Sequence, residues 1–267
     1  QRADVVVLAH RDGAPVGARR VYGPAPALGP VRLAGPGVHG RGCPQGVGGA
    51  ELTDPMPTSA LLLDLDHTLF DPESIPTSVM EPAWAQLRAA HARIGGVSRE
   101  VLEASILELM GSPITLVARK HGWPDELRRA ALEASGSAVL PRHLPLFPDV
   151  AELVLLPQRK ILVTTGVPAV QLQKIASLGI GAWLDAVHVD DALAEPRRGK
   201  RAVFRAILEE EGLSAEDAVV VGDNLDSEIA AGTQLGIRTV HVARWGCSPE
   251  CPATHCMSDL CGLAAVL

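Results

Sequence analysis

Short, unbroken runs of apolar residues alternate along this chain with longer stretches in which apolar side chains recur every three or four positions. The clearest runs are residues 60–63, 161–163 and 218–221. An apolar run of this length, with no polar residue at alternate positions, is typical of a strand buried on both faces of a parallel sheet. The pattern therefore predicts three central strands, and we expect two further strands at about 186–189 and 239–242.

The stretches between the later strands have helical spacing. We predict helices at about 149–156, 169–178 and 225–235, and one more whose buried face holds Val203, Phe204, Ile207 and Leu208. Strands that alternate with helices indicate βαβ units and a parallel sheet. We therefore predict an α/β fold, a doubly wound, Rossmann-like parallel sheet built from residues 59–76 and 141–267.

Residues 77–140 interrupt this alternation with a helical pattern throughout. The side chains that carry the spacing are Trp84, Leu87, His91 and Ile94, then Leu102, Ile106 and Leu109, then Leu127, Ala131 and Ala134. Ser98 is a suitable N-cap for the second group, and Pro124 is suited to the first turn of the third. The pattern predicts a small helical domain inserted after the first strand of the core.

The first 58 residues differ in composition from the rest of the chain. They hold 11 Gly and 8 Pro, whereas the remaining 209 residues hold 28 of these two types together. Such a stretch sustains neither helical nor strand periodicity for long. We therefore predict that residues 1–58 are a disordered arm.

Charge and composition exclude some classes of function. Lys and Arg number 24 against 31 Asp and Glu, a net charge of −7, which argues against a nucleic-acid partner. No apolar stretch approaches the roughly 18 residues of a membrane-spanning helix, so no membrane association is expected. Five cysteines do not suggest a disulfide scaffold, and we expect a cytoplasmic protein.

Polar side chains with chemical potential follow the predicted strands. Asp64, Asp66 and Thr68 come directly after the first apolar run, Thr164 ends the second, and Asp223 follows the third. In open α/β sheets, ligands bind beyond the carboxyl ends of the strands. Carboxylates buried there are costly unless a cation or hydrogen bonds compensate them. The pattern predicts a divalent-cation site with a nucleophile in it.

Four separated motifs carry a resemblance to a known family. In chain order they are Asp64-Leu65-Asp66-His67-Thr68, then Thr164, where the second apolar run ends before Gly166, then Lys200, and finally Gly222-Asp223-Asn224-Leu225-Asp226-Ser227-Glu228. The chain resembles the haloacid-dehalogenase-like (HAD) hydrolases over roughly residues 58–245. The resemblance implies a magnesium-dependent phosphatase, with residues 77–140 as a cap domain that closes over the site and selects the substrate.

The resemblance also implies roles for individual residues. Asp64 would be the nucleophile that forms an aspartyl-phosphate, and Asp66 would protonate the leaving oxygen and later take a proton from water. Thr164 would donate a hydrogen bond to the phosphoryl group. Thr68, Thr165, Gly166 and Arg198 would complete the substrate-binding residues. Dehalogenating members lack the second acid, so Asp66 favours phosphoryl chemistry.

The lysine of the third motif departs from the family pattern. Where relatives often have Lys-Pro, this chain has Glu195-Pro196, and a glutamate cannot neutralise phosphate. Of four lysines, only Lys200 opens the helix that precedes the last acidic motif, whereas Lys174 lies in mid-helix. We therefore assign the role to Lys200 and keep Arg198 as the alternative.

The resemblance implies Mg²⁺ as the cofactor, with Asp64, Asp66, Asp223 and Glu228 as its ligands. The family usually has an Asp where this chain has Glu228, and Asp226 is the alternative second acid. Both acids are also expected in the first turn of a helix, where negative side chains are favourable without any metal. Their position therefore does not decide which of the two is the ligand.

Cysteines crowd the C-terminus. Cys247, Cys251, Cys256 and Cys261 lie there together with His255. We interpret them as small residues of a tail that covers the edge of the sheet, with a zinc site as the alternative.

The sequence as a whole predicts the hydrolysis of a small phosphorylated metabolite, a phosphomonoester, with Mg²⁺ and an aspartyl-phosphate intermediate. Two alternatives remain open at this point. A phosphomutase would return the phosphoryl group to a sugar instead of water. A catalytically inactive member of the family would act by binding or regulation, an alternative kept open by the displaced lysine and by Glu228.

Overall fold

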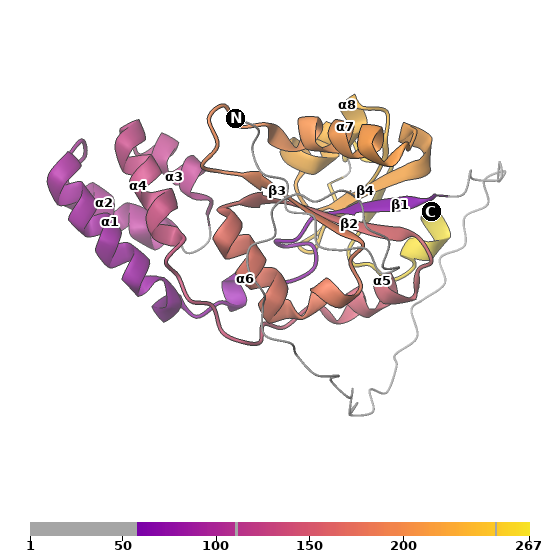
Figure 1. The fold of residues 1–267 in the computed structure, drawn as a ribbon, viewed down its shortest axis with the longest axis horizontal. Helices are drawn as coiled ribbons and strands as arrows, with labels where there is room; N and C mark the ends of the chain where they lie inside the picture. Colours follow the sequence, from indigo (N-terminus) through magenta and orange to yellow (C-terminus); the bar gives the residue numbers. More distant parts are fainter. Residues whose placement is uncertain (1–57, 110–111, 249) are drawn as a thin grey trace.

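The computed structural model describes residues 58–109, 112–248 and 250–267 (Figure 1). The predicted N-terminal arm therefore lies outside the described residues, except for its last residue. Thr58 is buried, and its hydroxyl donates a hydrogen bond to the carbonyl of the C-terminal Leu267 at 2.7 Å. Thr58 thus belongs to the folded core.

The centre of the molecule is a six-stranded sheet with the order β3-β2-β1-β4-β5-β6, in which every neighbouring pair is parallel (Figure 1). The strands are β1 (Ala60–Leu63), β2 (Arg159–Gly166), β3 (Ala186–Asp191), β4 (Ala218–Gly222), β5 (Arg238–Val242) and β6 (His255–Met257). The five strands predicted from apolar runs are confirmed. The sixth was not predicted, because its three residues are neither uniformly apolar nor long enough to form a recognisable pattern.

Helices cover both faces of the sheet. They are α5 (Ala151–Leu155) and α6 (Pro168–Leu178) on one face, and α7 (Gly199–Glu211) and α8 (Ala230–Gln234) on the other (Figure 1). Leu61 and Leu63 of β1 pack into one core with α5 and α6, whereas Ala60 and Leu62 pack into the other with α7 and α8. This alternation follows from the two-residue period of a strand. The predicted doubly wound parallel sheet is confirmed.

A second group of helices interrupts the chain between β1 and β2. These are α1 (Glu81–Ile94), α2 (Arg99–Glu108), α3 (Ile114–Lys120) and α4 (Asp125–Ser135), and they lie to one side of the sheet (Figure 1). They share a core of their own, in which Trp84, Leu87, Leu102 and Leu127 are buried. The Ser98 hydroxyl accepts the Val101 N–H at 3.3 Å, which caps α2 as expected. In the described part of the chain, no helix is both long and apolar enough to span a membrane.

The buried side chain of His188 on β3 predicts a pH-dependent stability. Burial lowers the pKa of His188 below its ordinary value, and Arg198 acts in the same direction, whereas Glu210 and Glu211 oppose the shift. The unfolded chain then takes up this proton at a higher pH than the folded chain, so stability is lost as pH falls below about 6.5. In urea titrations, His188→Gln should lose less stability than the wild type between about pH 7.5 and pH 5.5. The exposed His143 offers the control: His143→Gln should behave as the wild type, and equal losses in all three proteins would contradict the prediction.

Candidate functional site

The candidate site lies beyond the carboxyl ends of β1, β2 and β4. Asp64 directly follows β1, and its backbone N–H donates to the Val221 carbonyl of β4 at 2.9 Å. Asp223 is the first residue after β4. Because the backbone pairing continues through Asp64, the position of its carboxylate is fixed by the sheet itself.

Three carboxylates converge at this edge. Single oxygens of Asp64, Asp223 and Glu228 all lie within 4.8 Å of one another. Glu228 belongs to a π-helical turn, Leu225–Ile229, and its Oε1 accepts the Asn224 N–H at 2.6 Å. A Cβ on Gly222 would come within 2.7 Å of that same oxygen, which explains a glycine here. The second acid in the cluster is thus Glu228, since the side chain of Asp226 is exposed.

Lys200 is the cation of this cluster. Its Nζ donates to Asp64 Oδ1 and, at 2.8 Å, to Glu228 Oε2, and the side chain is only 5% exposed. Burial lowers the pKa of Lys200, but the attraction of Asp64 and Glu228 is stronger and the net shift is upward, so the ammonium stays charged. Gly199 precedes it with φ of +73°, a conformation that favours glycine. Arg198, the alternative cation, is exposed.

The cluster carries more negative than positive charge. Burial raises the pKa of Asp64, and repulsion from Glu228 and Asp223 adds to the effect despite the opposing Lys200. Burial and Glu228 likewise raise the pKa of Asp223. Three carboxylates around one ammonium leave room in the charge balance for a divalent cation, and carboxylate oxygens are the donors that Mg²⁺ prefers. The residues present therefore fit a magnesium ion.

Thr68 completes this group. The side chain is buried, and its hydroxyl lies 3.4 Å from Asp64 Oδ2 and 3.2 Å from Asp223 Oδ1. A hydroxyl has one proton, so it donates to one carboxylate at a time. Thr68 thus links the acids that follow β1 and β4.

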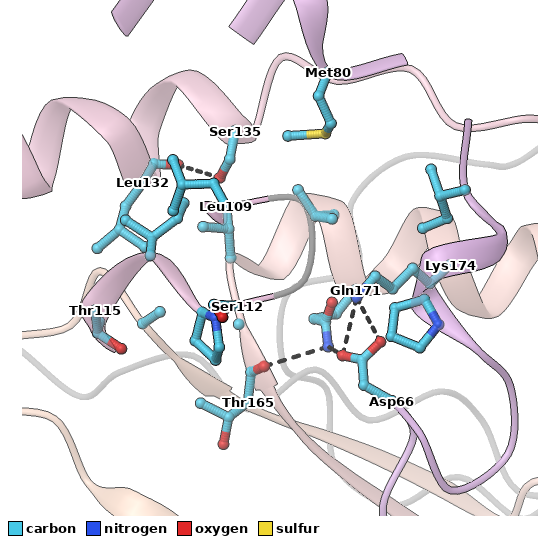
Figure 2. A pocket seen from close by; sticks show the side chains of 18 of the residues that line it. Asp66, Met80, Leu109, Ser112, Thr115, Leu132, Ser135, Thr165, Gln171 and Lys174 are labelled. Carbon is cyan, nitrogen blue, oxygen red and sulfur yellow. Dashed lines mark hydrogen bonds and ion pairs between the residues drawn. The ribbon is translucent and has the colours of Figure 1, made fainter. Parts of the chain in front are cut away.

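Asp66 has a separate set of contacts. Its carboxylate accepts from Lys174 Nζ at 2.6 and 2.9 Å and from Gln171 Nε2 at 3.2 Å (Figure 2). The sequence analysis placed Asp66 among the metal ligands, but its carboxylate does not lie in the cluster of Asp64, Asp223 and Glu228. The physical reason is that α6 supplies both partners that hold the Asp66 carboxylate.

The three expected binding residues at the end of β2 gather around Gln171. The Thr164 hydroxyl, nearly fully buried, accepts a hydrogen bond from Gln171 Nε2. A Cβ on Gly166 would come within 2.9 Å of the Gln171 side chain, so the glycine makes this approach possible. The Thr165 carbonyl also accepts from Gln171 Nε2, at 3.3 Å, whereas its hydroxyl donates to Asp190 Oδ2 at 3.2 Å.

Sequence reasoning missed Gln171 and Lys174. Lys174 was set aside as a mid-helix lysine, although it lies three residues after Gln171 and therefore on the same helical face. Two polar residues at this spacing, on a helix that directly follows a motif strand, were the available signal. The pattern gave no indication that this face points toward Asp66.

A cavity of about 330 Å³ adjoins Asp66 and lies between the two groups of helices. Its polar residues include Asp66, Thr165, Gln171 and Lys174 (Figure 2). Its apolar wall comes from the inserted helices and from the segment after β2, and it includes Met80, Trp84, Leu109, Ile114, Leu132, Val167 and Val170. The volume is in the range of small-molecule sites.

The substitution Lys174→Met tests whether Lys174 positions the carboxylate of Asp66. Loss of the ammonium leaves Asp66 held by Gln171 alone. With Asp66 in the acid role that the resemblance implies, we expect kcat to fall roughly 10- to 100-fold, with KM little changed. Lys174→Arg should restore most of kcat, because it keeps the charge beside Asp66. Lys120→Met, at an exposed lysine of α3, is the matched control and should be neutral. Steady-state kinetics decide the matter, and a wild-type kcat in Lys174→Met would contradict the assignment.

Comparisons with known proteins agree with this architecture. A family model of haloacid dehalogenase-like hydrolases matches residues 58–236. The phosphoserine phosphatase of Thermus thermophilus is 28% identical over 190 residues, which cover 67% of this chain and 70% of that protein.

Solved structures show the same fold. A HAD phosphatase from Thermococcus onnurineus superposes with a TM-score of 0.53 at 19% identity, over 78% of this chain and 97% of the other. A haloacid dehalogenase-like family hydrolase from Streptococcus pneumoniae gives 0.53 at 16%, over 78% and 98%. Since the family model spans well over half of the sequence, the chain belongs to the haloacid dehalogenase-like hydrolases.

Proposed function

We propose that this protein hydrolyses a small phosphomonoester with Mg²⁺ and that Asp64 forms an aspartyl-phosphate intermediate. The observation that carries the proposal is the arrangement of carboxylates at the sheet edge. Asp64 lies with Glu228, Lys200 and the half-buried Asp223 in one group, while Asp66 is held apart beside a cavity. The likeness to a protein named phosphoserine phosphatase supports phosphoryl rather than halide chemistry.

The proposed reaction has two steps. A carboxylate oxygen of Asp64 attacks phosphorus, the bond from phosphorus to the leaving oxygen breaks, and protonated Asp66 gives its proton to that oxygen. Water then attacks the phosphoryl group, Asp66 takes a proton from this water, and the bond between Asp64 and phosphorus breaks to release phosphate. The proton that Asp66 gave in the first step is thereby returned in the second.

Asp64, Asp223 and Glu228 would hold the magnesium ion, whose charge supports the negative phosphoryl oxygens when bound. Lys200, in the first turn of α7, would contribute a second positive charge to the same group. Thr164 and Thr165 would donate hydroxyl hydrogen bonds to the phosphoryl oxygens, once substrate displaces their present contacts. Preorganised charge and hydrogen bonds of this kind are the main source of catalysis in phosphoryl transfer.

The cavity beside Asp66 would receive the alcohol part of the substrate. Its wall is largely apolar, and apolar walls leave sugar hydroxyls without hydrogen-bond partners. This argues for a compact alcohol with some hydrocarbon surface, and against the sugar phosphate that a mutase needs. The inserted segment supplies much of this wall through α1, α3, α4 and the residues next to them, in keeping with a cap that selects the substrate.

A screen of phosphorylated metabolites would test the proposal. The purified protein should release inorganic phosphate from a subset of monoesters with Mg²⁺ present, and a chelator should abolish the release. Transfer of phosphate between sugar positions without its release to water would identify a mutase. A protein that binds phosphorylated ligands but never forms a trapped beryllofluoride adduct would be an inactive relative, and the proposal would fall.

A further inference from the structure

A second group of metal-binding side chains lies near the carboxyl end of β5, in the C-terminal part of the chain. It consists of His241 on β5, Cys251 in the following loop and Cys256 on β6. His241 Nδ1 is 3.4 Å from Cys251 Sγ and 3.5 Å from Cys256 Sγ, and all three ligand atoms lie within 4.8 Å of one another. The imidazole is buried and the cysteines are half-buried. Nothing in the proposed phosphatase reaction uses these side chains.

The tautomer of His241 makes its other nitrogen available to a cation. Nε2 lies 2.9 Å from the Asp223 carbonyl oxygen, which can only accept, so Nε2 carries the proton. In the neutral ring, Nδ1 then has no proton and directs its lone pair at the two sulfurs. Histidine ligands of metals are usually fixed in this way, by a hydrogen bond from the second ring nitrogen to a carbonyl or carboxylate.

The distances match a zinc site. Zn–S bonds of about 2.3 Å and Zn–N bonds of about 2.0–2.1 Å, at tetrahedral angles, separate the nitrogen from each sulfur by roughly 3.5 Å. The observed separations of 3.4 and 3.5 Å agree with that value. In this structure Cys256 Sγ is part of a disulfide and has no proton to donate, so its approach to Nδ1 is not a hydrogen bond. A cation between the three atoms would satisfy all of them.

Cys247 would be the fourth ligand. In this structure it is bonded to Cys256 as a disulfide, which places its sulfur at the same cluster. A thiol or phosphine reductant supplies two electrons, and two protons complete the pair of thiols. Zinc binding then releases the thiol protons, since thiolate is the ligand form. The reduced segment therefore presents a Cys₃His set, the composition of structural zinc sites.

We propose that the reduced protein binds one Zn²⁺ through His241, Cys247, Cys251 and Cys256, and that this ion fastens β6 and the preceding loop to β5. The sequence analysis offered His255 as the nearby histidine, whereas the ring that meets the sulfurs is that of His241. The same ring supports the backbone of Asp223, so the zinc site lies one hydrogen bond from the proposed magnesium ligands.

The test uses the whole chain, reduced with a phosphine under nitrogen, loaded with zinc and freed of excess metal. We expect about one zinc per chain by elemental analysis and sulfur neighbours of zinc in X-ray absorption. Sulfur neighbours distinguish this site from zinc bound to the oxygen ligands of Asp64, Asp223 and Glu228. Cys251→Ser should lose the bound zinc, while Cys261→Ser, outside the cluster, should retain it.

Cobalt binding to the wild type keeps the test decisive if Cys251→Ser fails to fold. The Co²⁺ complex should show thiolate-to-metal charge transfer and the intense visible bands of a tetrahedral site. Their absence in the reduced wild type would overturn the proposal. So would zinc with sulfur neighbours in Cys251→Ser, or a Cys247–Cys256 disulfide that persists under reduction while no metal binds.

Discussion

Asp64→Asn is expected to lower the turnover rate roughly 10⁴-fold or more, because no other described group can replace the attacking carboxylate. The amide keeps the shape of the side chain and its place beside Lys200, so the fold should persist. Beryllofluoride, which mimics a phosphoryl group on a carboxylate, should bind the wild type and fail to bind Asp64→Asn. Phosphate release and adduct formation, measured on the best substrate of the screen, check both statements.

Two further substitutions give this result its meaning. Asp66→Asn should still form the beryllofluoride adduct but turn over about 10²-fold or more slowly, the usual loss for a general acid. Asp226→Asn, at the exposed acid of the π-helical turn, should leave both readouts near the wild type. If Asp64→Asn kept wild-type activity on any phosphomonoester, the aspartyl-phosphate mechanism would be wrong.

The sheet was predictable because its strands are buried on both faces. Runs such as Ala218–Gly222 are apolar at every position that the two helical layers cover, and such runs need no alternation to be recognised. The helix expected at 225–235 begins instead with a π-helical turn over Leu225–Ile229. The spacing of apolar residues does not reveal that a single turn of a helix is π-helical. This π-helical turn nevertheless places Glu228 in the carboxylate cluster. π-Turns of this kind are frequent at functional sites.

The candidate site was predictable only where its residues follow strands. Asp64 and Asp223 were found because the carboxyl ends of parallel strands meet at one edge. Lys174 and His241 were missed because their partners are distant in sequence: Lys174 contacts Asp66, and His241 contacts Cys251 and the Asp223 carbonyl. Such pairings depend on how a helix or an edge strand is packed, and local pattern carries no information about that.

Lys200→Ala should lower catalysis by roughly 10²-fold or more, as loss of one preorganised charged group does in other enzymes. The side chain is buried between Asp64 and Glu228, and it carries the positive charge that the protein itself supplies to this cluster. Arg198→Ala is the control from the same turn, and the exposure of Arg198 predicts a much smaller loss. Steady-state kinetics on both variants test the ranking.

Measurements of the free energy of unfolding can show whether Lys200 acts through its charge or only through packing. Without the ammonium, Asp64 and Glu228 are left as uncompensated buried charges, which typically costs about 3–5 kcal/mol. Magnesium supplies charge to the same carboxylates, so it should restore more stability to Lys200→Ala than it adds to the wild type. Urea unfolding with Mg²⁺ and with a chelator measures this difference. Equal responses to Mg²⁺ would mean that Lys200 does not balance the acid cluster, and a larger kinetic loss in Arg198→Ala would transfer the catalytic role to that residue.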